Sequence, residues 1–140
     1  MKLEVYSDGS SDGKTGGIGG WGFVVLVDGV KVYENNGSEA NATNNSMECM
    51  GAVSGLEYVV MTYPQAEDVT LISDSQLVLR WATGEYKIKK LHLIPYVIRL
   101  RKSFRLLNAK TRWERGHQGE PNNERCDELA KTARKSGEAE

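Results

Sequence analysis

Apolar residues recur along the chain with two spacings, and these spacings predict where strands and helices lie. Alternating or continuous apolar runs predict five strands, at residues 2–7, 21–27, 30–38, 69–74 and 111–115. Apolar residues three and four positions apart predict a long helix within residues 43–62, with an apolar stripe of Cys49, Ala52, Val53, Leu56, Val59 and Val60. Shorter helices are expected at residues 75–82, 95–107 and 122–136. This order predicts a single-domain α/β fold, a five-stranded mixed sheet with helices on both faces.

Turn-forming residues between these elements indicate the topology. Asp28-Gly29 separates two apolar runs and is a hairpin signal, so the second and third strands should pair antiparallel. The glycine-rich stretch 8–20 is expected to be a loop. The first strand and the strand after the long helix can lie side by side and parallel, because the helix provides the crossover.

The long helix carries its own signals. Residues 44–46 are all good N-cap residues, so the helix is expected to begin among them. Glu48 would then lie in the first turn, where the helix dipole favours negative charge. Gly51 and Gly55 lower helix stability and therefore suggest close packing on the sheet.

The length and composition are those of one globular domain. The 140 residues allow a substantial core, and we expect one domain over residues 1–137 with a polar C-terminal tail at residues 138–140. The chain has no 18-residue apolar run, and Met1 leads directly into a strand pattern. We therefore expect no membrane span, no signal peptide and a cytoplasmic protein. Cys49 and Cys126 are expected to be free thiols.

The net charge is −1, but basic and acidic residues are distributed unevenly along the chain. Residues 80–115 contain 11 Lys or Arg and two acids, a net of +9, whereas the rest has 7 basic and 17 acidic residues, a net of −10. This pattern suits a protein that holds a polyanion with one region and metal ions with another. A solvated basic helix is the alternative. The basic residues expected to meet phosphates are Lys87, Lys89, Lys90, Arg101, Lys102 and Arg105.

Four acids occupy positions that suggest a shared site. Asp8 and Asp74 each end a strand-like run, Glu48 opens the long helix, and Asp127 lies in the last helix. Any one of them alone is most often a cap or turn former. Ligands of such sheets bind beyond the carboxyl ends of the strands, where these acids could meet. Carboxylates without Cys or His partners suit Mg²⁺ or Mn²⁺, and two such ions can cleave a phosphodiester.

Three other motifs fail on physical grounds. Residues 17–22 match the G-x-G-x-x-G pattern of dinucleotide-binding proteins. The next predicted element is a strand, so no helix N-terminus is available to bind a pyrophosphate. Residues 8–19 begin like an EF-hand loop, yet the twelfth position is Gly19 and no helices flank it. The two histidines and two cysteines lack zinc spacing.

The acids lie within short sequence motifs, here called words, that together resemble those of type I ribonuclease H (RNase HI) over almost the whole chain. The words are Ser7-Asp8-Gly9-Ser10, Thr43-Asn44-Asn45-Ser46-Met47-Glu48, Ser73-Asp74-Ser75-Gln76, Gly116-His117 and Asn123-Glu124-Arg125-Cys126-Asp127-Glu128-Leu129-Ala130. The compact segment 84–89 is similar to the short-handled subgroup of that family. The resemblance implies the ribonuclease H-like fold and a metal-dependent endoribonuclease that cuts the RNA strand of RNA/DNA hybrids, leaving 5′-phosphate and 3′-hydroxyl ends.

The resemblance also implies roles for individual residues. Asp8, Glu48, Asp74 and Asp127 would hold two Mg²⁺ or Mn²⁺ ions, and His117, on a loop, would assist proton transfer or product release. The implied substrate contacts are Gly9, Ser10, Asn44, Asn45 and Gln76 in the RNA minor groove, and Thr43 on a DNA phosphate. Amides and hydroxyls can both donate to and accept from a ribose 2′-OH. An RNA/DNA hybrid is the expected partner, and the protein is expected to be a monomer without an obligatory protein partner.

The chain departs from the family pattern in two places. The family's Gly-Asn-Pro-Gly turn is here Gly13-Lys14-Thr15-Gly16, with one residue inserted, so the RNA contacts of this loop stay open. The long basic protrusion and the separate hybrid-binding domain of some members are missing, so the grip on substrate should be modest.

Three rival functions fit less well. A hybrid-binding module without catalysis would be expected to lack one of the acids. An ATPase of the sugar-kinase type needs two such domains, and 140 residues allow one. A nuclease for DNA junctions would not need Asn44, Asn45 and Gln76 as readers of a 2′-OH.

Overall fold

The computed structural model describes residues 1–14, 16–116 and 118–139. Within them the chain forms five strands, four α-helices and one short 3₁₀ helix. In chain order these are β1 (Lys2–Ser11), β2 (Gly19–Val27), β3 (Val30–Glu39), α1 (Asn44–Thr62), β4 (Asp68–Ser73), α2 (Gln76–Thr83), η1 (Leu91–Leu93), α3 (Ile94–Leu106), β5 (Lys110–Trp113) and α4 (Pro121–Glu138).

The strands form one mixed sheet in the order β3-β2-β1-β4-β5. β1 pairs antiparallel with β2, and β2 with β3, across the predicted hairpin, where Asp28 and Gly29 have φ values of 49° and 81°. β1 and β4 are parallel neighbours, and so are β4 and β5. The predicted crossover through the long helix is therefore confirmed.

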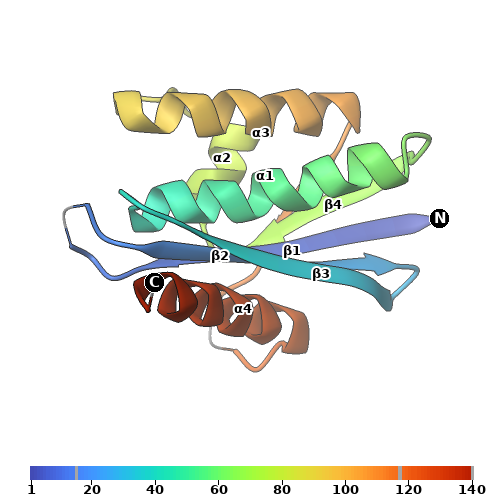
Figure 1. Cartoon of the computed structure of the whole chain (residues 1–140). Helices are drawn as coiled ribbons and strands as arrows, with labels where there is room; N and C mark the ends of the chain where they lie inside the picture. The colour runs from blue at the N-terminus through green and yellow to red at the C-terminus, as the bar shows by residue number, and fades with distance from the viewer. Residues whose placement is uncertain (15, 117, 140) are drawn as a thin grey trace.

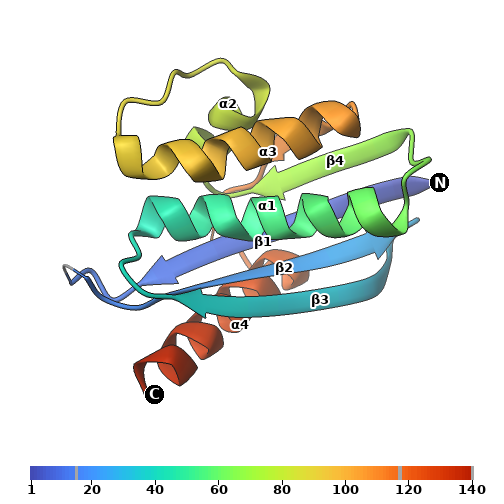
Figure 2. The same cartoon turned by 45° about the horizontal axis from the view of Figure 1, so that its top comes forward.

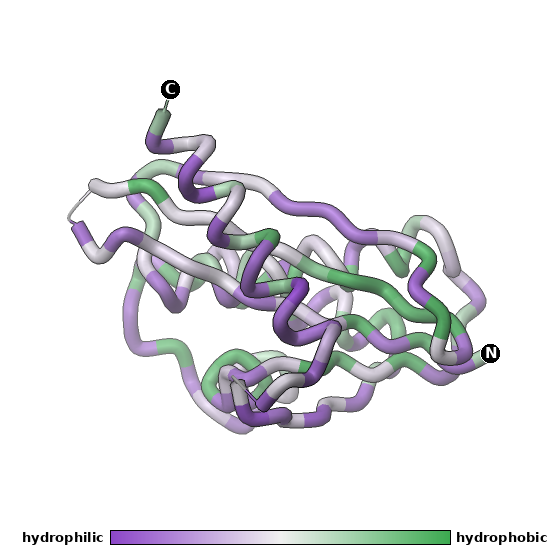
Figure 3. Tube along the Cα trace, turned by 90° about the horizontal axis from the view of Figure 1, so that it is seen from below, coloured by the Kyte–Doolittle hydropathy of each residue, from purple (hydrophilic) through white to green (hydrophobic). Residues whose placement is uncertain are grey.

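Helices cover both faces of this sheet (Figures 1 and 2). α1 lies directly on one face, with α2 and α3 beyond it, and α4 lies on the opposite face. In the view from the α4 side, α4 is mostly hydrophilic, whereas the strands behind it carry the longer hydrophobic stretches (Figure 3). No helix of the described residues is long and apolar enough to cross a membrane.

The two faces of the sheet bury cores of different size. The larger core joins the sheet to α1, α2 and α3, and includes Val5, Leu56, Leu71 and Leu100 at 0% exposure. The smaller core lies under α4 and contains Tyr6, Val24, Leu26, Ile72, Cys126 and Leu129. Both cysteines are buried and unpaired, as predicted.

The predicted loop over residues 8–20 is wrong at both ends. β1 continues through Asp8 to Ser11, and it stays paired with β2 from Asp8 opposite Gly22 to Ser11 opposite Gly19. The glycines of this ladder hid the strand, because they remove the apolar alternation on which the prediction rests. Asp8 therefore lies inside a strand, just beyond the last residue pair that joins β1 to β4, Tyr6 with Ile72.

α1 begins at Asn44, within the predicted range, but its N-cap lies one residue before that range. Thr43 is the N-cap, because its Oγ1 accepts from Ser46 N–H while Ser46 Oγ accepts from Thr43 N–H in a reciprocal capping box. Glu48 consequently lies in the second turn instead of the first, and the first turn holds no acid. The helix dipole therefore does less for Glu48 than its sequence position suggested.

Candidate functional site

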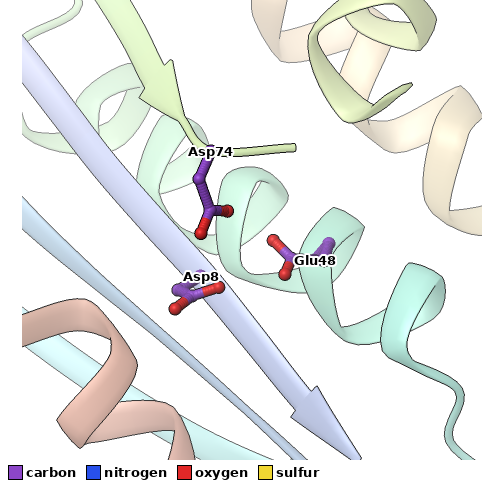
Figure 4. Close-up of side chains that lie close together, drawn as sticks. All are labelled: Asp8, Glu48 and Asp74. Carbon is purple, nitrogen blue, oxygen red and sulfur yellow. The ribbon is translucent and has the colours of Figure 1, made fainter. Parts of the chain in front are cut away.

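Three carboxylates from distant parts of the sequence point toward one another at one edge of the sheet (Figure 4). Asp8 comes from β1, Glu48 from α1 and Asp74 from the residue after β4. One oxygen from each lies within 4.8 Å of the others. This separation suits oxygen ligands that share a small divalent cation.

Glycines allow α1 to approach β1 so closely. A Cβ at Gly9 would lie 2.3 Å from both Glu48 N and the Met47 carbonyl carbon, and one at Gly51 would lie 2.7 Å from the Asp8 carbonyl oxygen. Cβ atoms do not occur at such distances from backbone atoms, so only glycine fits here. The two glycines therefore bring the Asp8 and Glu48 side chains into one site.

The end of β5 and the residue that follows it hold the segment at Asp74 in place. Trp113 Nε1–H donates to the Asp74 carbonyl oxygen at 3.0 Å. Glu114 N–H donates to the Ser73 carbonyl oxygen at 3.1 Å, which extends the contact between the two segments. A Cβ at Gly116 would lie 2.6 Å from Asp74 Oδ2, so this glycine leaves room for the carboxylate.

Asp127 borders the same site from the opposite face of the sheet. It lines a hollow of about 20 Å³ together with Asp8, Asp74, Asn123 and Glu124. Its Oδ2 is 3.0 Å from Lys131 Nζ, one helical turn away. The structure therefore brings three predicted acids into one cluster and places the fourth beside it, paired with a lysine.

Burial and mutual repulsion make the acid cluster costly when no cation is bound. Burial, with the charges of Asp74 and Asp127, raises the pKa of Asp8 to about 6, although the interaction with the Glu48 carboxyl and the hydrogen bond from Gly9 N–H oppose the shift. Burial and the Asp8 charge raise the pKa of Glu48 well above its usual range. Glu48 Oε2 is buried and has no hydrogen-bond partner. A buried carboxylate oxygen without a donor fits a site that binds a cation.

The predicted readers of RNA lie next to this cluster, at the end of β1 and the start of α1. Asn44 is exposed, and its Oδ1 accepts from Ser11 N–H and Ser11 Oγ–H, both at 3.0 Å. Thr43 is exposed and caps α1, which leaves its hydroxyl hydrogen free to donate. Ser10 is only 9% exposed, and its Oγ accepts from Arg134. Gly9 is half-buried where β1 crosses α1.

The predicted lysines line a groove that continues from the start of α1. Its volume is about 700 Å³, and it is lined by Asn45, Leu77, Trp81, Glu85, Tyr86, Lys87, Lys89, Lys90 and Leu93. All three lysines are exposed on the rim, and none forms an ion pair among the described residues. Gln76 lies outside this groove, in a neighbouring hollow of about 230 Å³ that it shares with Arg80 and Trp113.

The basic residues of α3 are placed differently from one another. Arg101 donates to the carbonyl oxygens of Trp81 and Tyr86, both at 2.8 Å, so it holds the end of α2 and the following loop together. Lys102 and Arg105 line a separate hollow on α3, to which Arg101 also contributes. Arg101 is thus engaged inside the protein, which the charge pattern alone did not reveal. The predicted His117 lies outside the described residues.

Sequence reasoning missed residues that act on the site from β5 and α4. Trp113 contacts Asp74 through its indole N–H, and Asn123 and Glu124 line the hollow at Asp8. Their side chains carry no periodic signal. The sequence pointed to Asn123 and Glu124 only through their place in the same motif as Asp127.

Comparison with known proteins gives one consistent family. The RNase H family model matches residues 1–135. A ribonuclease H of Lachnoclostridium phytofermentans is 38% identical over 156 residues, covering 98% of this chain and 94% of the relative. A ribonuclease H of Pseudomonas savastanoi pv. phaseolicola is 37% identical, covering 91% and 89%.

Solved structures agree in fold over the whole length. RNase H1 from Halobacterium salinarum is 28% identical with a TM-score of 0.81, covering 97% of this chain and 99% of that protein. LC11-RNase H1, solved in complex with an RNA/DNA hybrid, is 25% identical with a TM-score of 0.82, covering 97% and 99%.

Proposed function

The chain belongs to the RNase H family, and we propose that it hydrolyses the RNA strand of RNA/DNA hybrids with the help of divalent metal ions. The observation that carries the proposal is the convergence of Asp8, Glu48 and Asp74, with a buried Glu48 oxygen that lacks a hydrogen-bond partner. Such a cluster is self-repelling, so it is best explained by a cation that it binds. The hybrid bound by LC11-RNase H1 supports the choice of substrate.

The donor set fits hard cations, so we take the ions to be Mg²⁺ or Mn²⁺, two per site with substrate bound. Asp8 and Asp74 would share the ions, while Glu48 and Asp127 would hold one each. The bound ions would supply an activated water and neutralise charge on the scissile phosphate. We propose 5′-phosphate and 3′-hydroxyl products. His117 would help to move a proton or release product.

The remaining residues would hold the hybrid in place. Asn44 and Asn45 lie on α1 beside the cluster, and Gln76 lies at the start of α2. Their amides suit a ribose 2′-OH. The lysine groove suits backbone phosphates. We further propose that residues 1–137 act as the catalytic domain of a monomer in the cytoplasm, without an obligatory protein partner.

Duplex selectivity tests the proposal. RNA/DNA, RNA/RNA and DNA/DNA duplexes of one sequence are incubated with the purified protein and Mg²⁺, and each strand is followed on a denaturing gel. Cleavage of the hybrid alone is expected, because the other duplexes lack either the cleavable ribose strand or the hybrid shape. Equal cleavage of DNA/DNA would contradict the assignment, and binding of the hybrid without cleavage would favour a binding module.

The lysine groove makes a second prediction. Changing Lys87, Lys89 and Lys90 together to Ala should raise KM about tenfold and lower the salt slope of log kcat/KM by roughly 3, because three phosphate contacts are lost at about 0.9 each. The same change at three lysines near the opposite end of the sheet is a charge-matched control, namely Lys2, Lys31 and Lys110. A groove variant with the control's KM and salt slope would show that its lysines are only solvated.

A further inference from the structure

Arg134, in the second half of α4, is a cation held largely inside the protein. Its side chain is 21% exposed, and Nη1 donates to Ser10 Oγ at 2.8 Å and to the Ser11 carbonyl oxygen at 3.4 Å. Gly20 allows this approach, because a Cβ there would lie 2.5 Å from Arg134 N. The guanidinium therefore fixes the end of β1, two and three residues beyond Asp8.

The hydrogen bonds continue from the end of β1 to the start of α1. Ser11 N–H and Ser11 Oγ–H both donate to Asn44 Oδ1 at 3.0 Å. An amide oxygen has two lone pairs, so Asn44 retains only its N–H groups for another partner. Asn44 is exposed and lies four residues, about one helical turn, before Glu48.

This arrangement selects a hydrogen-bond acceptor as the partner of Asn44. A free Asn side chain can turn its amide and present either the oxygen or the N–H groups. The two bonds from Ser11 remove that freedom. A ribose strand offers a 2′-oxygen as acceptor, whereas a deoxyribose strand has no oxygen at this position.

We propose that Arg134 is a positioning residue that sets the preference for a ribose strand. It holds Ser10 and Ser11 in place, and Ser11 in turn orients the Asn44 amide as a donor to the 2′-oxygen. The inference rests on the proposed function, because it requires the hybrid to lie across the carboxylate cluster. Arg134 itself touches neither the substrate nor the reacting atoms.

Duplex binding without metal provides a test that does not depend on catalysis. RNA/DNA and DNA/DNA duplexes of one sequence carry a fluorescent dye, and their Kd values are measured by anisotropy in EDTA. Arg134→Gln should weaken hybrid binding about tenfold, the loss expected for one hydrogen bond, and leave DNA/DNA binding nearly unchanged. Arg134→Lys, which keeps the charge and one donor, should fall between the parent and Arg134→Gln.

The matched control is Lys135→Gln, because Lys135 is exposed on the same helix and its loss removes the same charge. In Mg²⁺, Arg134→Gln should raise KM for the hybrid with kcat nearly unchanged, whereas Lys135→Gln should leave both near the parent values. Equal weakening of both duplexes by Arg134→Gln would overturn the proposal. So would a hybrid Kd equal to that of the Lys135→Gln protein.

A double-mutant cycle tests whether Arg134 acts through Asn44. Arg134→Gln should add little to the loss already caused by Asn44→Ala, whereas fully additive losses would overturn the relay. Failure of the proposed function would look different. A parent protein that cuts no hybrid in Mg²⁺ would contradict that function, while the comparison in EDTA would still decide the role of Arg134.

Discussion

Asp8→Asn should lower Mg²⁺-supported cleavage of a hybrid by roughly 10³-fold or more and yet leave the metal-free protein at least as stable as the parent. The loss of activity is expected because Asp8 is one of the three carboxylates that converge in the cluster. Asn keeps the shape of the side chain but removes the charge that would attract a cation. The two effects have opposite signs because one group serves catalysis at the expense of stability.

The gain in stability has a defined pH dependence. The pKa of Asp8 rises from 3.8 to about 6 in the folded, metal-free protein, so ionisation of this group disfavours folding. The penalty is absent below the unfolded-state pKa, grows as the pH rises through this interval, and is complete above about pH 6. We expect a gain of at least about 1 kcal/mol at pH 7, since each pKa unit is worth about 1.4 kcal/mol.

Thermal unfolding at pH 4 and pH 7, with and without Mg²⁺, measures these effects. Mg²⁺ should stabilise the parent more than Asp8→Asn, because the ion binds the folded site. Asp28→Asn is the matched control, since it makes the same chemical change at the β2–β3 hairpin, where Asp28 contacts Lys2 at the opposite end of β1 from the cluster. A metal-free Asp8→Asn protein clearly less stable than the parent at pH 7 would mean that Asp8 is a structural residue.

Gly9→Ala should destabilise the protein by about 3 kcal/mol, at the upper end of the cost of overpacking. The added Cβ would lie 2.3 Å from Glu48 N and from the Met47 carbonyl carbon, and these backbone atoms can move only if α1 shifts away from β1. Such a shift would also separate Asp8 from Glu48. Activity should therefore fall further than the lost stability alone explains.

Gly37→Ala separates this effect from the ordinary cost of replacing a strand glycine. The three atoms nearest to a Cβ at Gly37 belong to the ring of Trp21, a half-buried side chain, whereas those nearest to a Cβ at Gly9 are backbone atoms. Urea unfolding of the two variants should show a much smaller loss for Gly37→Ala. Equal losses would mean that α1 and β1 can part at little cost, and the crossing at Gly9 would not determine the site.

The fold class could be predicted from the sequence because the apolar residues of the larger core recur with regular spacing along the chain. The stripe along α1, the hairpin at Asp28-Gly29 and the apolar β4 each gave a clear signal, and the five-stranded mixed sheet is confirmed. The extension of β1 through Asp8 was missed because glycine replaces side chains where α1 and α4 press on the sheet. The apolar pattern therefore predicts a loop here, although the glycines mark places where a helix lies close to the strand backbone.

The site was predictable in part for a related reason. The convergence of Asp8, Glu48 and Asp74 followed from parallel strands that end at one edge of the sheet. The contacts of Arg101, Trp113 and Arg134 could not be foreseen, because each joins residues that only the folded chain brings together. Sequence patterns thus predicted which charged residues belong to the site or to the basic region. The structure shows which of these side chains form hydrogen bonds within the protein.

The most direct test of the account follows both strands of one hybrid during cleavage. RNA and DNA strands with different dyes are incubated in Mg²⁺ with the parent protein and with Glu48→Gln, which keeps the side-chain shape and removes its charge. The account predicts that the parent cuts only the RNA strand and that Glu48→Gln cuts neither. Comparable loss of the DNA strand, or a Glu48→Gln protein that cuts RNA at the parent rate, would contradict it.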